Sequence, residues 1–203
     1  MRPYQWFLSP LLSFFIVGLA MGETYPINIR YQPLKIFPSL QQKIGSVIGI
    51  APFKDDRSDK LYIGHQTVFR RVSHYLKSEP YPLEKAISES VSQAVSRYGV
   101  KPVSVPKWDG RPDSLKNTRA DSILMVEIKR FWTEGTIAAR RTNVNTSIYL
   151  VIHLGVKKEG KVFTRDVYAI KESAVGRLTP AGAEEMVNEI LTGIFDAFFS
   201  NPY

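Results

Sequence analysis

Three long strand patterns follow one another in this chain without a helix between them. They are "ADSILMVEIKRFW" at 120–132, "NTSIYLVIHLGVKK" at 145–158 and "KVFTRDVYAIKESAV" at 161–175. In the second, apolar residues alternate with polar ones, which is typical of a strand with one buried face. Glu159-Gly160 indicates a hairpin turn between the second and the third. A sheet of this kind needs a covering layer, which the rest of the sequence must supply.

Two amphipathic helices are predicted to form that layer. The first is "PLEKAISESVSQAVSRYG" at 82–99, with Pro82 at its first position and Gly99 as the left-handed residue that ends it. Its apolar stripe is Leu83, Ile87, Val91, Ala94, Val95 and Tyr98. The second occupies 180–199, with Thr179 as N-cap. Its broad apolar face, together with acidic residues at other positions, indicates a core helix rather than a membrane helix.

The remaining segments complete a single domain. "SVIGIAPF" at 46–53 is predicted to be a strand buried on both faces, and 100–105 a short strand. Residues 62–80 fit either a helix or a strand. The predicted fold class is α+β: a single mainly antiparallel sheet with two helices packed on one face, in the order β-α-β-β-β-β-α.

The N-terminus predicts export. Residues 1–22 contain one charge, Arg2, then an apolar run that ends in Ala20-Met21-Gly22. The run is shorter than the roughly 20 residues that span a bilayer, and its end fits a signal-peptidase site. We expect a cleaved signal peptide at 1–22, an extended leader at 23–45 and the domain at 46–203. The alternative is an uncleaved N-terminal anchor.

The sequence offers no recognisable catalytic, cofactor or metal site. Cysteine is absent, so disulfides and thiolate chemistry are excluded. No nucleophile elbow, zinc-protease helix, phosphate loop or dinucleotide fingerprint occurs. The three histidines, His65, His74 and His153, lack a partner at metal-ligand spacing. The chain is therefore predicted to be neither an enzyme nor a cofactor-binding protein.

An acidic loop follows the first predicted domain strand. Asp55, Asp56 and Asp59 could together bind a hard cation. The same loop contains Lys54, Arg57 and Lys60, which can neutralise these carboxylates. The favoured interpretation is a structural loop in which Asp55 and Arg57 pair with each other or with the backbone.

Basic residues occur as doublets in a chain of formal net charge +8. The doublets are Arg70-Arg71, Lys129-Arg130, Arg140-Arg141 and Lys157-Lys158. Arg140-Arg141 lie in a connection between strands, which should be exposed. Because the chain is predicted to be exported, an anionic lipid or glycan surface is a better partner than nucleic acid. The candidate contact residues are Arg140, Arg141, Lys129 and Arg130. The alternative is scattered charge that serves solubility.

Two segments carry a resemblance to a known family. "IGIAPFKDDRSDKLYIG" and "PLEKAISESVSQAVSRYGVKP" resemble the YajG-like group of bacterial envelope lipoproteins, in which a buried strand precedes an Asp-x-Arg segment, an Ile-Gly and an amphipathic helix. Here these are Asp55 and Arg57, Ile63-Gly64 and residues 83–99. A similar start occurs in the amino-terminal domain of the Tol-system periplasmic protein. The resemblance covers most of 46–199 and implies a non-enzymatic protein attached to the outer membrane. This chain departs at the lipid site, where Gly22 and Glu23 stand in place of an acceptor cysteine.

The predicted function is an exported envelope accessory or binding protein without enzymatic activity. It would be periplasmic, or anchored in the inner membrane if the signal is retained. Its partner would be an envelope protein or an anionic lipid or glycan surface, and the oligomeric state is left open. One alternative is a lipid- or transport-associated subunit, which an apolar groove or an exposed Phe patch would favour. The other is a hydrolase, favoured by a histidine, a carboxylate and a hydroxyl in one pocket.

Overall fold

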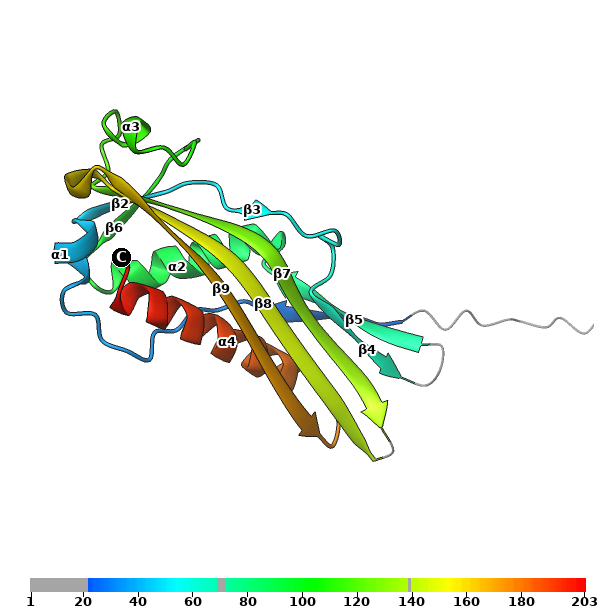
Figure 1. The fold of residues 1–203 in the computed structure, drawn as a ribbon. Coiled ribbons are helices and arrows are strands. Elements are labelled where there is room, and N and C mark those ends of the chain that lie inside the picture. Colours follow the sequence, from blue (N-terminus) through cyan, green and yellow to red (C-terminus); the bar gives the residue numbers. More distant parts are fainter. Residues whose placement is uncertain (1–21, 69–71, 139) are drawn as a thin grey trace, which may run out of the picture.

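A computed structural model describes residues 22–68, 72–138 and 140–203 (Figure 1). The strands are β1 (Thr24–Asn28), β2 (Val47–Ile50), β3 (Lys54–Asp55), β4 (Gly64–Val68), β5 (Val72–Glu79), β6 (Lys101–Ser104), β7 (Ser122–Ala138), β8 (Arg141–Val156) and β9 (Lys161–Val175). The α-helices are α1 (Leu40–Ile44), α2 (Leu83–Ser96), α3 (Pro112–Leu115) and α4 (Pro180–Ser200). The ambiguous segment 62–80 is thus a pair of strands, β4 and β5.

The strands form one mixed sheet, so the prediction of an α+β fold with a mainly antiparallel sheet is confirmed only in part. β7, β8 and β9 are antiparallel neighbours, as expected. The other edge of β7, however, pairs in parallel with three short strands in succession: β2, β3 and β4. β1 and β6 add two further parallel pairings, with β5 and β2. Alternation within a strand identifies its buried face but carries no information on the direction of its neighbour.

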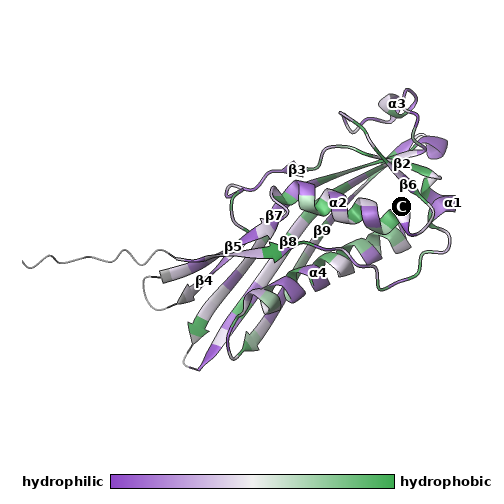
Figure 2. Cartoon of the chain, turned by 180° about the vertical axis from the view of Figure 1, so that it is seen from behind, coloured by the Kyte–Doolittle hydropathy of each residue, from purple (hydrophilic) through white to green (hydrophobic). Residues whose placement is uncertain are grey.

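Both long helices cover the same face of the sheet, as predicted. Figures 1 and 2 show α2 and α4 on one side of β7, β8 and β9 from opposite views. The predicted stripe of α2 is buried from Leu83 to Val95, and Gly99 has a φ of +75°. Pro82 is the N-cap of α2 rather than its first helical residue. Thr179 caps α4 by accepting a hydrogen bond from the Gly182 amide at 3.1 Å.

The last helix belongs to the core. Its phenylalanines Phe195, Phe198 and Phe199 are buried, and Phe195 is 0 % exposed. They pack beside Tyr31 and Phe37, which come from the segment expected to be a leader. None of the helices in the described ranges has the length and apolar character needed to cross a membrane.

The hairpin of β7 and β8 is longer than the sequence indicated. β7 continues from Trp132 to Ala138 and pairs with β8 along its whole length. The segment "TEGT" at 133–136 pairs with β8 as a strand, and Gly135 lies against Leu178 and Gln66, where an added Cβ would lie 2.9 Å from the leucine side chain. This glycine permits close packing rather than a turn.

Candidate functional site

One face of the sheet is left uncovered by the long helices, and we call it the open face. On β7, β8 and β9 its half-buried or exposed side chains include Glu127, Trp132, Tyr149, Asp166 and Tyr168. Tyr168 is 58 % exposed and packs edge to face against Tyr149. A small second core, built around Trp108 and Leu115, covers only the end of this face near Ile123 and Met125. The rest of the open face is therefore a surface that the fold offers to a partner.

A bulge in β7 brings Lys129 and Arg130 to the surface together. The register with β8 shifts between Ile128 and Arg130, so the extra residue breaks the alternation and both basic side chains are exposed. Sequence reasoning identified the doublet but could not locate the bulge. Neighbouring residues in a regular strand would have pointed to opposite faces.

Lys129 belongs to a network of charges. Its ammonium lies 2.7 Å from Asp56 and 2.8 Å from Glu127, and Lys54 also reaches Glu127 at 3.4 Å. Hydrogen bonding to these carboxylates raises the pKa of Lys129, and the same bonds lower the pKa values of Asp56 and Glu127. The charge of Lys129 is thus balanced within the protein.

Arg130 is held differently. Its Nε donates a hydrogen bond of 2.6 Å to the Ser147 hydroxyl on β8. No carboxylate among the described residues lies within ion-pair distance of this guanidinium. Arg130 therefore carries a fixed positive charge that the described part of the protein does not neutralise.

Asp55 and Arg57 form the buried pair that the sequence predicted. The Asp55 carboxylate accepts from Nε at 2.9 Å and from Nη2 at 2.7 Å. The remaining Nη1 donates to the carbonyls of Tyr62 and Phe131. This confirms the structural interpretation, and no group of side chains suited to a metal ion occurs within the described residues.

Arg140 and Arg141 occupy the far end of the β7–β8 hairpin. Both are exposed, and Arg141 pairs with Ala138 in the ladder. Eight residues of strand separate this level from Arg130, a distance of about 26 Å at 3.3 Å per residue. The two doublets lie on one hairpin but do not form one cluster. Arg70-Arg71 lie outside the described residues.

The hairpin end is also where the described chain begins. Gly22 lies against Ser73, Ser73 pairs with Thr67 in the ladder, and Thr67 pairs with Thr136 on β7. Figure 1 shows β4, β5, β7 and β8 ending on this side, where the chain enters. Lys157-Lys158 are at the opposite end of β8, where they donate to the carbonyls of Thr118 and Gln42.

His153 is the histidine closest to a catalytic arrangement. Its Nδ1 lies 2.9 Å from the Thr164 hydroxyl, and its Nε2 lies 3.9 Å from Glu127. Burial lowers the pKa of His153, so the ring is neutral at neutral pH. The cavity beside the bulge, about 330 Å³ in volume, is lined by Arg57, Ser58, Asp59 and residues 129–132, and His153 is not in its wall. The histidine, carboxylate and hydroxyl thus meet on a strand surface, not in that cavity.

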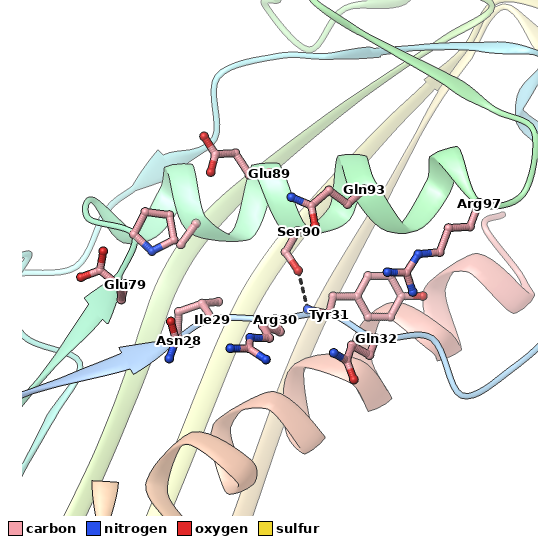
Figure 3. Close-up of a pocket in the computed structure, with 12 residues that line it drawn as sticks. Asn28, Ile29, Arg30, Tyr31, Gln32, Glu79, Glu89, Ser90, Gln93 and Arg97 are labelled. Carbon is pink, nitrogen blue, oxygen red and sulfur yellow. Dashed lines mark hydrogen bonds between the residues drawn. The ribbon is translucent and has the colours of Figure 1, made fainter. Parts of the chain in front are cut away.

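The segment at 23–45, expected from the sequence to be an extended leader, is part of the folded domain. β1 joins the sheet beside β5, and the chain then passes between α2 and α4 (Figures 1 and 3). Glu184, Asn188 and Asp196 on α4 accept hydrogen bonds from backbone amides of this segment. Ser90 on α2 accepts one from the Tyr31 amide, as Figure 3 shows.

The cleft between this segment and α2 has a volume of about 220 Å³, and Arg30, Glu79, Glu89 and Arg97 are among its lining residues. Ser90, which also lines this cleft, holds the segment by accepting from the Tyr31 amide. The spacing of Glu184, Asn188 and Asp196, at intervals of four and eight, is the only sequence signal for this role, since it places all three on one helix face.

Comparisons with solved structures support the fold. A protein of the family DUF330 from Xanthomonas campestris matches with a TM-score of 0.57 and 14% identity, covering 88% of this chain and 93% of its own. A homolog of a neuraminyllactose-binding hemagglutinin from Helicobacter pylori matches with a TM-score of 0.49 and 10% identity. The match covers 85% of this chain and 90% of that protein. A lipoprotein from Neisseria meningitidis matches with a TM-score of 0.32 and 11% identity, covering 75% of this chain and 97% of that protein.

At these identities the matches concern the fold alone, and the DUF330 match carries that conclusion. No protein-family model and no curated protein sequence matches this chain. Membership of the YajG-like group stays a prediction.

Proposed function

We propose that this protein is an exported, non-enzymatic binding or accessory module of the bacterial envelope. The observation that carries the proposal is the division of the sheet. α2 and α4 bury one face, whereas the open face presents Trp132, Tyr149 and Tyr168 among charged groups. A surface that is aromatic, polar and rigid is suited to hold a partner.

The alternatives receive less support from the same residues. A lipid-carrying subunit would be favoured by an exposed Phe patch on α4, but Phe195, Phe198 and Phe199 are buried. A hydrolase would be favoured by a pocket around His153, whereas this side chain lies on the sheet beside Thr164.

We further propose that the hairpin end faces an anionic surface of the envelope. Arg140 and Arg141 are exposed there, at the level of the sheet where Gly22 enters. Residues 1–21 would therefore connect to the domain at its basic end, whether as a signal that is removed or as a retained anchor. Intact-mass analysis of the protein from envelope fractions distinguishes these two forms.

Photocrosslinking in cells tests the binding face. A photoreactive amino acid at Tyr168 is expected to give a discrete adduct, because this side chain is central on the open face and 58 % exposed. The matched control is Glu185, which is exposed on α4, on the other side of the sheet. Equal adducts at both positions, or none at Tyr168, would contradict the proposal.

A further inference from the structure

The cavity beside the β7 bulge has the dimensions and chemistry of a small ligand site. We call it the bulge cavity. Its volume of about 330 Å³ lies at the lower end of the range for ligand pockets, roughly 300–1,000 Å³. One wall is the loop with Ser58 and Asp59, and the other is the strand with Lys129, Arg130 and Trp132. Such a volume suits a unit of about one sugar ring.

Of the three basic side chains that line the bulge cavity, Arg130 is the one available to bind an anionic ligand. Arg57 is committed to Asp55 and to two carbonyls, and Lys129 is bonded to two carboxylates. Among the residues that the structure describes, Arg130 makes a polar bond through Nε alone, to Ser147. That bond fixes the plane of the guanidinium while both terminal nitrogens keep their N–H donors. A terminal guanidinium edge binds a carboxylate through two parallel hydrogen bonds.

The other residues that line the bulge cavity suit a ring with hydroxyl groups. Trp132 is half-buried and offers a flat apolar surface, steadied by an edge contact with His65 at a centroid distance of 5.6 Å. Asp59 accepts from the amides of Leu61 and Tyr62 through Oδ1, so its Oδ2 can accept from a ligand hydroxyl. Ser58 supplies a further hydroxyl. An apolar face with hydroxyls around its edge is the surface of a pyranose ring.

We propose that the bulge cavity binds a carboxylate-bearing sugar unit of an envelope glycan. Arg130 holds the carboxylate, Trp132 packs against the ring, and Ser58 and Asp59 bond its hydroxyls. The inference rests on the proposed function, because it identifies one ligand class for a binding protein of the envelope.

The test is an NMR titration of the exported protein, observing the indole N–H of Trp132, assigned with Trp132→Phe. The probes are N-acetylmuramic acid and N-acetylglucosamine, two related sugars of which only the first has a carboxylate. We expect a saturable shift with the acidic sugar and about tenfold weaker binding of the neutral one, the difference that a charge-assisted hydrogen bond provides. Arg130→Gln should abolish this preference, whereas Arg111→Gln, at an exposed arginine in the loop before α3, should preserve it.

Three outcomes would overturn the inference. They are equal affinity for the two sugars, no saturable shift with either, and an unchanged preference in Arg130→Gln. A short-chain phosphatidylglycerol serves as the lipid comparison; stronger shifts of Trp132 with it than with the acidic sugar would assign the cavity to a headgroup instead. The adduct at Tyr168 is measured separately, so a failed sugar titration with a positive adduct removes only the glycan assignment.

Discussion

Arg57 and Asp55 form a bidentate ion pair in which Nε and Nη2 lie 2.9 and 2.7 Å from the two carboxylate oxygens. Both residues are nearly buried, at 7 % and 8 % exposure. The third nitrogen of the guanidinium binds two backbone carbonyls, one from the loop and one from β7. The pair therefore connects the loop between β3 and β4 to the strand that carries the bulge.

Loss of both members should reduce the free energy of unfolding by less than the two single losses added together. Asp55→Ala leaves the Arg57 charge buried and unpaired, so we expect a loss of roughly 3–5 kcal/mol in the free energy of unfolding. The double variant Asp55→Ala/Arg57→Ala should lose less than the sum of the single variants. Urea denaturation of all three proteins measures this. Strict additivity would show that the pair is not coupled.

The second prediction concerns the core face of α4. Phe195 is fully buried between Tyr31 and Phe199, so Phe195→Ala should cost roughly 3–5 kcal/mol through lost contacts and a cavity. Ile170→Ala is the matched control, because Ile170 is 52 % exposed on the open face. Thermal unfolding compares the two. A melting temperature unchanged by Phe195→Ala would contradict the packing of α4.

Asp196 should hold the segment after β1 in place. The residue is 3 % exposed, and its carboxylate accepts from the Tyr31 hydroxyl and from the amides of Leu34 and Lys35. Asp196→Ala leaves these donors unpaired, and we expect faster amide hydrogen exchange at 31–37. Glu185→Ala, an exposed change on the same helix, should leave that exchange unchanged. Equal protection in wild type and Asp196→Ala would argue against this anchoring role.

The fourth prediction is a dependence of stability on pH. Hydrogen bonds from the Val47 amide and from Ser46 lower the pKa of Asp121 below its ordinary 3.8. Because the folded pKa lies below the unfolded one, the carboxylate stabilises the fold above about pH 4 and loses this effect as the pH falls further.

Asp121→Asn should therefore be less stable than wild type at pH 7, by about 1 kcal/mol, and the difference should narrow towards pH 3. Asp113→Asn serves as the control, because Asp113 is exposed and its side chain bonds Lys116 alone within the described ranges. A difference that grows on acidification would contradict the assignment.

Periodicity in the sequence predicted the two helices that cover the sheet, because burial of one helix face requires a visible stripe. It could not predict the length of β7. The bulge places Lys129 and Arg130 on one surface, and Gly135 is required by the neighbouring Leu178, a contact from a distant part of the chain. The parallel neighbours of β7 were missed for a related reason, since β2, β3 and β4 are short and their order along β7 is a tertiary property.

The candidate site was predictable only in part. The pairing of Asp55 with Arg57 follows from opposite charges two residues apart beside a buried strand. The sequence does not show that the charge of Lys129 is paired and that of Arg130 is not. This difference depends on Asp56 and Ser147, which only the folded structure brings near. Asp196 is one of the acidic residues off the apolar face of α4, yet the structure buries it against the segment after β1.

Charge reversal at the hairpin end tests the central claim, that this protein is a binding module whose basic end faces an anionic envelope surface. The assay is co-sedimentation of the exported protein with phosphatidylglycerol-containing vesicles. Each basic residue near such a surface contributes about 1 kcal/mol, and salt screens exposed charges over about 8–10 Å. We expect binding at low salt and release near physiological salt. Arg140→Glu/Arg141→Glu should bind clearly less, whereas Lys157→Glu/Lys158→Glu, the same charge change at the opposite end of β8, should bind as wild type does. Equal binding by the two double variants, or no binding by wild type, would contradict the account.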